Sequence, residues 1–301
     1  MRVFLLLSLL LNPRLFGAAC CVGGSPKTFL SLQRLQKYEL GLSNSFRDVY
    51  GNYNPFGDLV EADKNQSLTL SLGADARLTH FLEAFFVFPW VYQTKQTGSG
   101  THYRSTIGDL SVGARWMLLE SLFQSDWYPT VGLVGGVKAP TGSVESVSSE
   151  GRLLPGTGTG NWEPYLALEL KKDYAPITVV LAAGLTVRLS RNAPDPAGGP
   201  NLLVRDGNRM EFSETVSYAL SRRLNIALGS NQFWELDRSI DGSVIPFSSS
   251  RAIGLALSSS YFFTQFLSLT GAVDFSIPRD RLGVNQQASR TFNFTVKQGF
   301  Y

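Results

Sequence analysis

Residues 66–92 read QSLTLSLGADARLTHFLEAFFVFPWVY, two runs of alternating apolar and polar residues separated by a short break at Thr79-His80. In residues 68–78 leucine and alanine hold every second position, and in residues 82–92 leucine, alanine, phenylalanine, tryptophan and tyrosine do the same. Because a strand points successive side chains to opposite faces, each run predicts a strand with one apolar and one polar face. About ten residues is the length that crosses a bilayer as a tilted strand. We therefore interpret this stretch as one of about six hairpins in a closed transmembrane barrel.

The composition favours a membrane β-barrel. Charged residues make up only 17% of the 301 residues, which is a low share for a soluble protein. The longest internal apolar run, residues 177–185 with Thr178 as an interruption, is shorter than the roughly 18–20 residues of a membrane helix. A membrane protein without membrane helices must be a closed barrel, because only closure pairs every backbone group in lipid. The net charge of +3, with no basic cluster, argues against nucleic acid as a partner.

The same alternation continues along the chain and predicts an all-β fold, a transmembrane antiparallel up-and-down β-barrel of about twelve strands. Connections are roughly two to eight residues after the even-numbered strands and roughly twelve to twenty-three after the odd ones, the layout of outer-membrane barrels. A soluble secreted β-sandwich stays open as the alternative fold, although it has no reason to keep this order. The predicted strands are residues 35–46, the two runs above, and residues 107–119, 128–138, 162–171, 177–190, 209–221, 224–234, 251–262, 267–276 and 289–301.

The N-terminal residues predict export. Arg2, a nine-residue apolar core and small residues before Cys20 are typical of a secretory signal peptide, so we expect a signal at 1–19, a periplasmic lead-in at 20–34 and the barrel at 35–301. Cys20 is a candidate for lipid modification. With an even strand number, both termini are expected in the periplasm of a Gram-negative cell and the barrel in its outer membrane.

Aromatic residues near strand ends suggest interfacial girdles, in which an amphipathic ring lies at headgroup depth. The last strand is rich in aromatic residues and ends at Tyr301, which resembles the terminal signal that barrel-insertion machinery reads. The expected partners are therefore outer-membrane lipids and this machinery, and a monomer is expected. The girdle candidates are Trp90, Tyr92, Trp127, Tyr128, Trp162, Tyr165, Trp234, Tyr261 and Phe262.

Four segments carry a family resemblance: residues 108–116 (GDLSVGARW), 137–142 (VKAPTG), 155–162 (PGTGTGNW) and 88–92 (FPWVY). They resemble strand and loop motifs of a bacterial outer-membrane family that is labelled after the MetA-pathway of phenol degradation. The likeness covers residues 65–190 well. Outside them only the layout of strands and connections is similar. It implies a membrane barrel and the passage of small molecules, aromatic compounds among them.

The polar residues, which occupy every second position of the strands, should face the lumen, and they include charges of both signs. One interpretation is a pore lining with local charge selectivity; the other is a salt-bridged plug that keeps a closed barrel rigid, since twelve strands leave limited interior room. The candidates are Asp75, Arg77, Asp109, Arg115, Lys138, Glu163, Glu169, Arg188, Glu211, Asn231, Asp274 and Lys297.

The sequence gives little support for a catalytic function. Some barrels of this size are phospholipases with a His-Ser-Asn arrangement, but His80 falls in a turn and His102 in a loop, where neither has an orienting partner. We interpret both as solvated loop histidines and expect no catalytic residue, metal site or cofactor. Residues 157–160 (TGTG) lack the Lys-Ser/Thr of a phosphate loop, and we interpret them as a flexible loop.

The sequence thus predicts a passive channel or transporter for small molecules in the outer membrane, and it does not name the solute. Two alternatives stay open: a non-conducting structural or adhesive barrel and, less favoured, an outer-membrane lipid hydrolase.

Overall fold

The computed structural model describes residues 36–53, 58–60, 64–97, 100–121, 127–144, 146–147, 153–154, 156–193, 201–246, 248–277 and 286–301. The expected signal peptide (1–19), lead-in (20–34) and first barrel residue lie outside these ranges. No helix in the described ranges is long and apolar enough to span a membrane.

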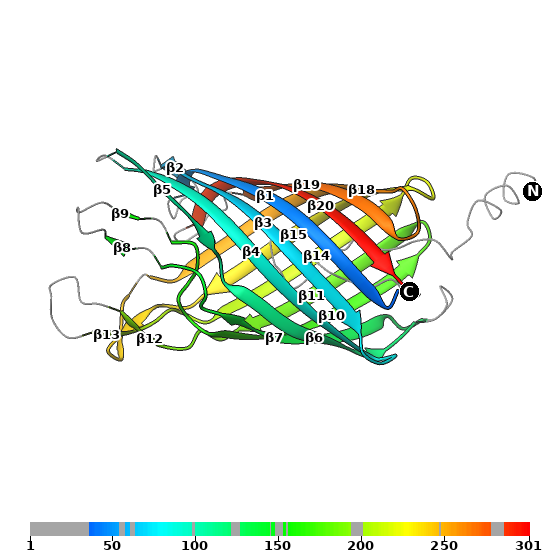
Figure 1. Ribbon diagram of the computed structural model, residues 1–301, viewed down its shortest axis with the longest axis horizontal. Helices are drawn as coiled ribbons and strands as arrows, with labels where there is room; N and C mark the ends of the chain where they lie inside the picture. The colour runs from blue at the N-terminus through cyan, green and yellow to red at the C-terminus, as the bar shows by residue number, and fades with distance from the viewer. Residues whose placement is uncertain are drawn as a thin grey trace, which may run out of the picture.

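Twelve long antiparallel strands of the described chain form one closed barrel, which confirms the predicted fold class (Figure 1). Each strand pairs with its neighbours in the sheet, and β1 pairs with both β20 and β3, so that the sheet has no free edge at closure. The strands are β1 (Tyr38–Tyr53), β3 (Asn65–Arg77), β4 (Leu82–Thr97), β6 (Leu110–Leu119), β7 (Thr130–Ala139), β10 (Glu163–Tyr174), β11 (Ile177–Thr186), β14 (Arg209–Ala219), β15 (Leu224–Glu235), β18 (Ser250–Phe262), β19 (Leu267–Ile277) and β20 (Gln286–Phe300).

Shorter strands lie at one end of the barrel, where the long connections gather (Figure 1). We call this the loop end, and the opposite end, with short connections at 78–81, 175–176, 220–223 and 263–266, the turn end. The described chain begins and ends at the turn end, where Lys37 N donates a hydrogen bond to Phe300 O (2.8 Å). The short strands are β2 (Leu59–Val60), β5 (Gly100–Ile107), β8 (Ser146–Val147), β9 (Leu153–Leu154), β12 (Arg191–Ala193), β13 (Leu202–Arg205), β16 (Ser239–Ile240) and β17 (Ser243–Val244).

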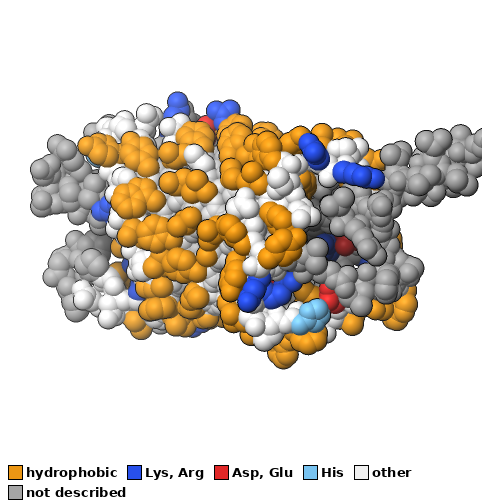
Figure 2. Space-filling view, turned by 45° about the vertical axis from the view of Figure 1, so that its right-hand side comes forward, with side chains coloured by type: hydrophobic (Ala, Val, Ile, Leu, Met, Phe, Trp, Pro, Cys, Tyr) orange, Lys and Arg blue, Asp and Glu red, His pale blue; other side chains and the backbone are white. Residues whose placement is uncertain are grey.

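The outer face of the barrel is apolar (Figure 2). Leu72 is 54% exposed and Leu168 is 42% exposed, whereas Asp75 and Glu163, on the opposite parity of the same strands, are buried. An oily exterior and a polar interior are what a membrane barrel requires. Glu214 is an exception: it is exposed on the outer face of β14, where its carboxylate accepts a hydrogen bond from Ser230 Oγ (2.9 Å).

Several predicted boundaries were wrong, most of them because strands run further than predicted; β11, in contrast, ends at Thr186, before the predicted end at residue 190. β1 continues to Tyr53, beyond the predicted end at residue 46, and β4 and β5 form a hairpin across residues 93–106, which lie between two predicted strands. β10 reaches Tyr174, beyond the predicted end at residue 171. Near the rim both faces of a strand meet water, so the apolar alternation that indicated strands inside the membrane fades there although the backbone pairing continues.

Candidate functional site at the loop end

Asp109 lies directly before β6 and its side chain is buried against the inner face of the wall. One carboxylate oxygen accepts a hydrogen bond from Gly142 N (2.9 Å); the other accepts bonds from Thr159 N (2.8 Å) and Thr159 Oγ1 (3.1 Å). Lys138 Nζ lies 3.6 Å from the second oxygen. We call this arrangement the Asp109 clamp. It holds two segments that leave the wall, 140–144 and 156–161, together at the inner face.

The clamp sits where the wall is discontinuous. β5 and β6 both pair with β4, but with different halves of it, and Gly108 lies at the step between them. Thr141 Oγ1 donates to Gly108 O (2.7 Å) and accepts from Leu110 N (2.9 Å), while Thr157 Oγ1 donates to Ile107 O (3.2 Å). The two hydroxyls thus satisfy backbone groups that the step leaves without strand partners, as buried polar groups require.

The TGTG segment is therefore not the flexible loop that the sequence suggested. Thr157 is buried, Thr159 binds Asp109, and Asn161 Nδ2 donates to Asp206 Oδ2 (2.7 Å). The error arose because small and hydroxyl residues are typical both of flexible loops and of backbone packed closely against another segment. A hydrogen-bonding partner distant in sequence distinguishes the two, and residues 157–160 alone do not reveal one.

Replacing Gly158 with alanine should destabilise the barrel. A Cβ at this position would lie 2.1 Å from Asp109 Oδ1 and 2.8 Å from the Cα of Gly142, so the clamp would have to open. We expect a loss of about 1–3 kcal/mol in the free energy of unfolding, as for other overpacked sites. Gly132→Ala is the matched control, because its Cβ would have no neighbour closer than 3.9 Å. Thermal unfolding in detergent measures both variants, and equal transition temperatures would contradict this account of Gly158.

A chain of ion pairs continues from the clamp around the inner wall. Lys138 Nζ lies 2.9 Å from Glu163 Oε2, and Arg188 Nε lies 3.0 Å from Glu163 Oε1. Arg188 Nη1 also pairs with Glu235. Burial lowers the pKa of the Arg188 guanidinium, but the carboxylates of Glu235 and Glu163 raise it more, so that the net pKa lies above its ordinary value. Four of the residues predicted to face the lumen, Asp109, Lys138, Glu163 and Arg188, therefore form one connected network.

A second network lies nearer the turn end. Glu83 accepts from Arg77 Nη2 (2.8 Å) and from Arg115 Nη1 (3.3 Å), and Arg115 Nε lies 3.2 Å from Glu169 Oε2. Asp75 is adjacent and only 2% exposed, and among the described residues neither of its carboxylate oxygens has a hydrogen-bond partner. Four predicted residues thus come together here, with Glu83 as a member that the sequence interpretation missed.

The remaining four predicted residues join neither network. Glu211 pairs with Arg209 (2.7 Å), Lys297 pairs with Glu39 (3.4 Å), and Asp274 Oδ2 accepts a bond from Asn293 Nδ2 (2.7 Å). Asn231 lies half-buried on β15.

The inner wall also carries aromatic rings. Phe85 of β4 and Tyr165 of β10 are buried and belong to one apolar cluster. A Cβ on Gly113 would lie 2.6 Å from the Phe85 ring, and one on Gly136 would lie 2.6 Å from the Tyr165 hydroxyl oxygen. The two glycines thus leave room for the rings across β6 and β7. Tyr165 was wrongly assigned to the membrane girdle: it shares its parity with Glu163, which is buried, and not with exposed Leu166.

From β14 to β20 the inner wall is lined mainly by small side chains. Hydroxyls pair across strands, as in Ser260 with Thr270 (2.8 Å) and Ser43 with Thr295 (3.0 Å). The ion-pair networks lie mostly on the other half, on β3 to β11, so the interior is chemically two-sided. The buried small residues are Thr215, Ser217, Ala227, Ala256, Ser258, Ser260, Thr270, Ala272 and Thr295.

The two histidines lie apart. His80 is in a turn 3.5 Å from Glu120 Oε2, as its exposed position allows. His102 is on β5 and buried, so its interpretation as a solvated loop residue was wrong, because the loop expected there is a strand. No group of three or more potential metal ligands occurs in the described ranges.

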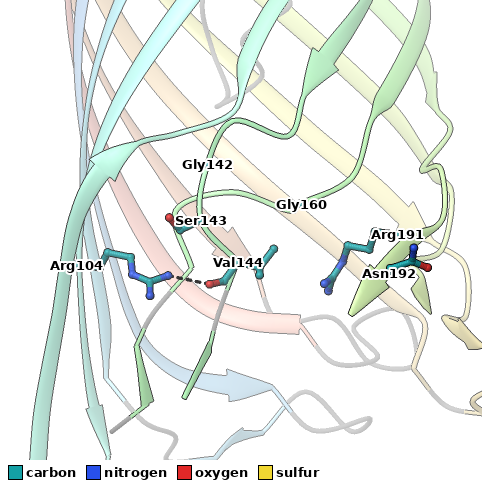
Figure 3. A pocket seen from close by; sticks show the side chains of 7 residues that line it. All are labelled: Arg104, Gly142, Ser143, Val144, Gly160, Arg191 and Asn192. Atoms are coloured by element: carbon teal, nitrogen blue, oxygen red, sulfur yellow. Dashed lines mark hydrogen bonds between the residues drawn. The ribbon is translucent and has the colours of Figure 1, made fainter. Parts of the chain in front are cut away.

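Two neighbouring pockets open at the loop end. The first, with a volume of about 470 Å³, lies beside the clamp and is lined by Arg104, Gly142, Ser143, Val144, Gly160, Arg191 and Asn192 (Figure 3). The second, of about 360 Å³, shares Val144 and Arg191 with it and contains the acidic residues Asp206 and Glu235. In the second pocket Asp206 lies 2.6 Å from Arg238 Nε, and Glu235 pairs with Arg188.

The fold is shared with solved outer-membrane barrels. The COG4313 outer membrane channel from Pseudomonas putida F1 superposes with a TM-score of 0.73 at 16% identity, over 92% of this chain and 100% of that chain. The translocator domain of the autotransporter NalP from Neisseria meningitidis gives 0.51 at 13% identity over 88% of each chain. The β domain of the Bordetella autotransporter BrkA gives 0.52 at 10% identity, over 88% of this chain and 100% of that one. At these identities the likeness establishes the fold.

The sequence itself matches a family model described as "Putative MetA-pathway of phenol degradation" over residues 56–295. No protein among the curated sequences matches.

Proposed function

Because the chain belongs to the family of the MetA-pathway of phenol degradation, we propose that it is a passive outer-membrane channel for small molecules, aromatic compounds among them. The observation that carries this proposal is the two-sided wall, with exposed leucines outside and hydrogen-bonded or ion-paired polar groups inside. The similar barrel from Pseudomonas putida F1 is described as an outer membrane channel, which supports the same function here.

The interior chemistry suits small solutes of low charge. Most of the charged side chains on the inner wall are paired with a neighbour on the same wall, so they present little net field across the lumen. Phe85 and Tyr165 place two aromatic rings on the inner wall, where they are buried in one apolar cluster, and the buried side chains of β14 to β20 are mainly small. A solute that reaches these rings would meet aromatic faces, which attract other rings in offset or edge-to-face geometry.

We place the loop end outside the cell and the turn end in the periplasm, together with both termini. Short periplasmic turns and long outer loops are the rule in such barrels, and the chain follows that layout. In this proposal the protein is a monomer and not an enzyme, and membrane lipid is its outer contact.

Folded protein in a planar lipid bilayer should produce discrete single-channel current steps. Folding is verified first by the shift in electrophoretic mobility that heating causes in intact barrels. A barrel that is folded and inserted yet silent would contradict the channel and favour the rigid, non-conducting alternative, which the ion-pair networks also fit. Block of the steps by phenol or toluene would then identify aromatic solutes.

A further inference from the structure

The first loop-end pocket is basic. Two guanidinium groups line it, Arg104 from β5 and Arg191 from β12, and their side chains enter from opposite sides (Figure 3). Ser143 and Asn192 add a hydroxyl and an amide to its lining. No acidic side chain lines this pocket in the part of the chain that the structure describes. Two guanidinium groups that converge on one pocket favour an anionic ligand.

The arginines are held in place by the backbone. Arg104 Nη1 donates to Val144 O (2.8 Å), which fixes its guanidinium beside the segment that the Asp109 clamp positions. Gly160 adopts φ +73°, and a Cβ there would lie 3.3 Å from the Cδ of Arg191, so this glycine leaves space for the arginine stem. The shape of the pocket is therefore set by contacts within the folded loops.

Arg191 lacks the partners that its neighbours have. Its Nε atom is buried and makes no hydrogen bond within the described part of the chain, whereas Arg188 and Arg238, in the adjoining pocket, both pair with carboxylates. A buried donor without a partner is costly, so a ligand that accepts a hydrogen bond from it would gain affinity. Guanidinium presents parallel N–H groups that match the two oxygens of a carboxylate or phosphate group.

The pocket faces the lumen side of the wall. Arg104 alternates along β5 with Tyr103, which is 68% exposed, and Ser105, which accepts a hydrogen bond from the exposed indole of Trp90 (3.0 Å). Tyr103 and Ser105 therefore lie on the outer face and Arg104 on the inner one. A headgroup of the surrounding lipid would meet the outer face, so a solute at the mouth of the barrel is the ligand that reaches Arg104 and Arg191.

We propose that Arg104 and Arg191 form an oxyanion-binding site at the mouth, which takes the carboxylate or phosphate group of a small solute. Ser143 and Asn192 serve as further donors. The site adds a substrate class to the proposed channel, small oxyanions with aromatic acids among them. Only the role of the site in solute passage rests on the proposed channel function. Binding itself does not require conduction.

Calorimetric titration of the folded, detergent-solubilised full chain tests the site at fixed ionic strength. The probes are benzoate, inorganic phosphate and the neutral analogue benzamide. Benzoate should bind and benzamide should not, and phosphate should compete with benzoate if a shared oxyanion site exists. Arg191→Gln should weaken benzoate binding at least about tenfold, the size expected for a lost charge-assisted bond. Arg205→Gln, which removes the same charge from an exposed position on β13, should leave binding unchanged.

Each outcome decides between the claims. Absence of benzoate and phosphate binding, equal binding of benzamide, or unchanged binding by Arg191→Gln would overturn the site. Phosphate binding without benzoate binding would retain the site and replace aromatic acids by phosphate-bearing solutes. If Arg191→Gln does not fold, Arg191→Lys keeps the charge but loses the planar fork, and severalfold weaker binding is then expected. If the barrel produces current steps but binds neither anion, only the proposed binding site is overturned. If it binds benzoate or phosphate but produces no current steps, only the proposed channel function is overturned.

Discussion

Replacing Asp109 with alanine is expected to release the loop segments 140–144 and 156–161 from the wall and to raise the single-channel conductance. The substitution removes the acceptor of three hydrogen bonds, from Gly142 N and from the amide and hydroxyl of Thr159, and one of the two carboxylates beside Lys138. Removing one member of a buried charge network costs about 3–5 kcal/mol, more than segments without regular strand pairing are expected to recover. The segments should then move away from the inner face.

Two measurements follow the release of the segments. Planar-bilayer recordings should show larger or noisier current steps, and trypsin should cleave within residues 139–161 faster than in the wild-type barrel. Asp48→Ala is the matched control, because Asp48 is also a buried, paired carboxylate near the loop end, yet its partners Gln66 and Arg290 belong to barrel strands. The same change in conductance and cleavage in both variants would show that lost charge, and not the clamp, is responsible.

The transmembrane strands could be predicted from the sequence because each obeys one local rule. Alternation from residue 67 onward places Leu72 outside and Asp75 inside whatever the rest of the chain does, and the structure has this arrangement. The rule failed where its physical cause ends. Tyr53 and Thr97 lie in strand segments that project beyond the apolar belt, so no apolar parity indicates them.

The clamp and the second network could be predicted only in part. Asp109, Lys138 and Arg115 were expected to face inward from parity alone, but their partners depend on strand register and on loop paths. Lys138 is opposite Glu163 because β7 pairs with β10 in one particular register. Thr159 reaches Asp109 across 50 residues, and nothing local in either segment encodes that contact. Tyr165 is different: it shares its parity with Glu163, so alternation alone indicates an inward ring, and Gly113 and Gly136 on neighbouring strands make room for it.

Leu72→Arg is expected to destabilise the barrel in lipid by about 2–4 kcal/mol, the cost of an arginine facing lipid at the bilayer midplane. Leu72 is exposed on the outer face of β3, five residues before the strand ends at Arg77. Five residues span about 16 Å along a strand, which at a tilt of about 40° is about 12 Å along the barrel axis. That depth is close to the middle of an apolar band about 25 Å tall. Urea unfolding in vesicles measures the free energy.

Leu78→Arg is the control that shows whether the cost at Leu72 arises from surrounding lipid. Leu78 is 60% exposed, similar to Leu72, but it lies in the turn after β3, where an arginine reaches water and should cost only about 0–1 kcal/mol. In a water-soluble sheet both leucines would already face solvent, and surface substitutions there usually change stability by less than about 0.5 kcal/mol. A gradient from Leu72 to Leu78 therefore requires lipid around β3. Equal, small changes in the free energy of unfolding for both variants would contradict a membrane location of the barrel, although they would not contradict the closed sheet.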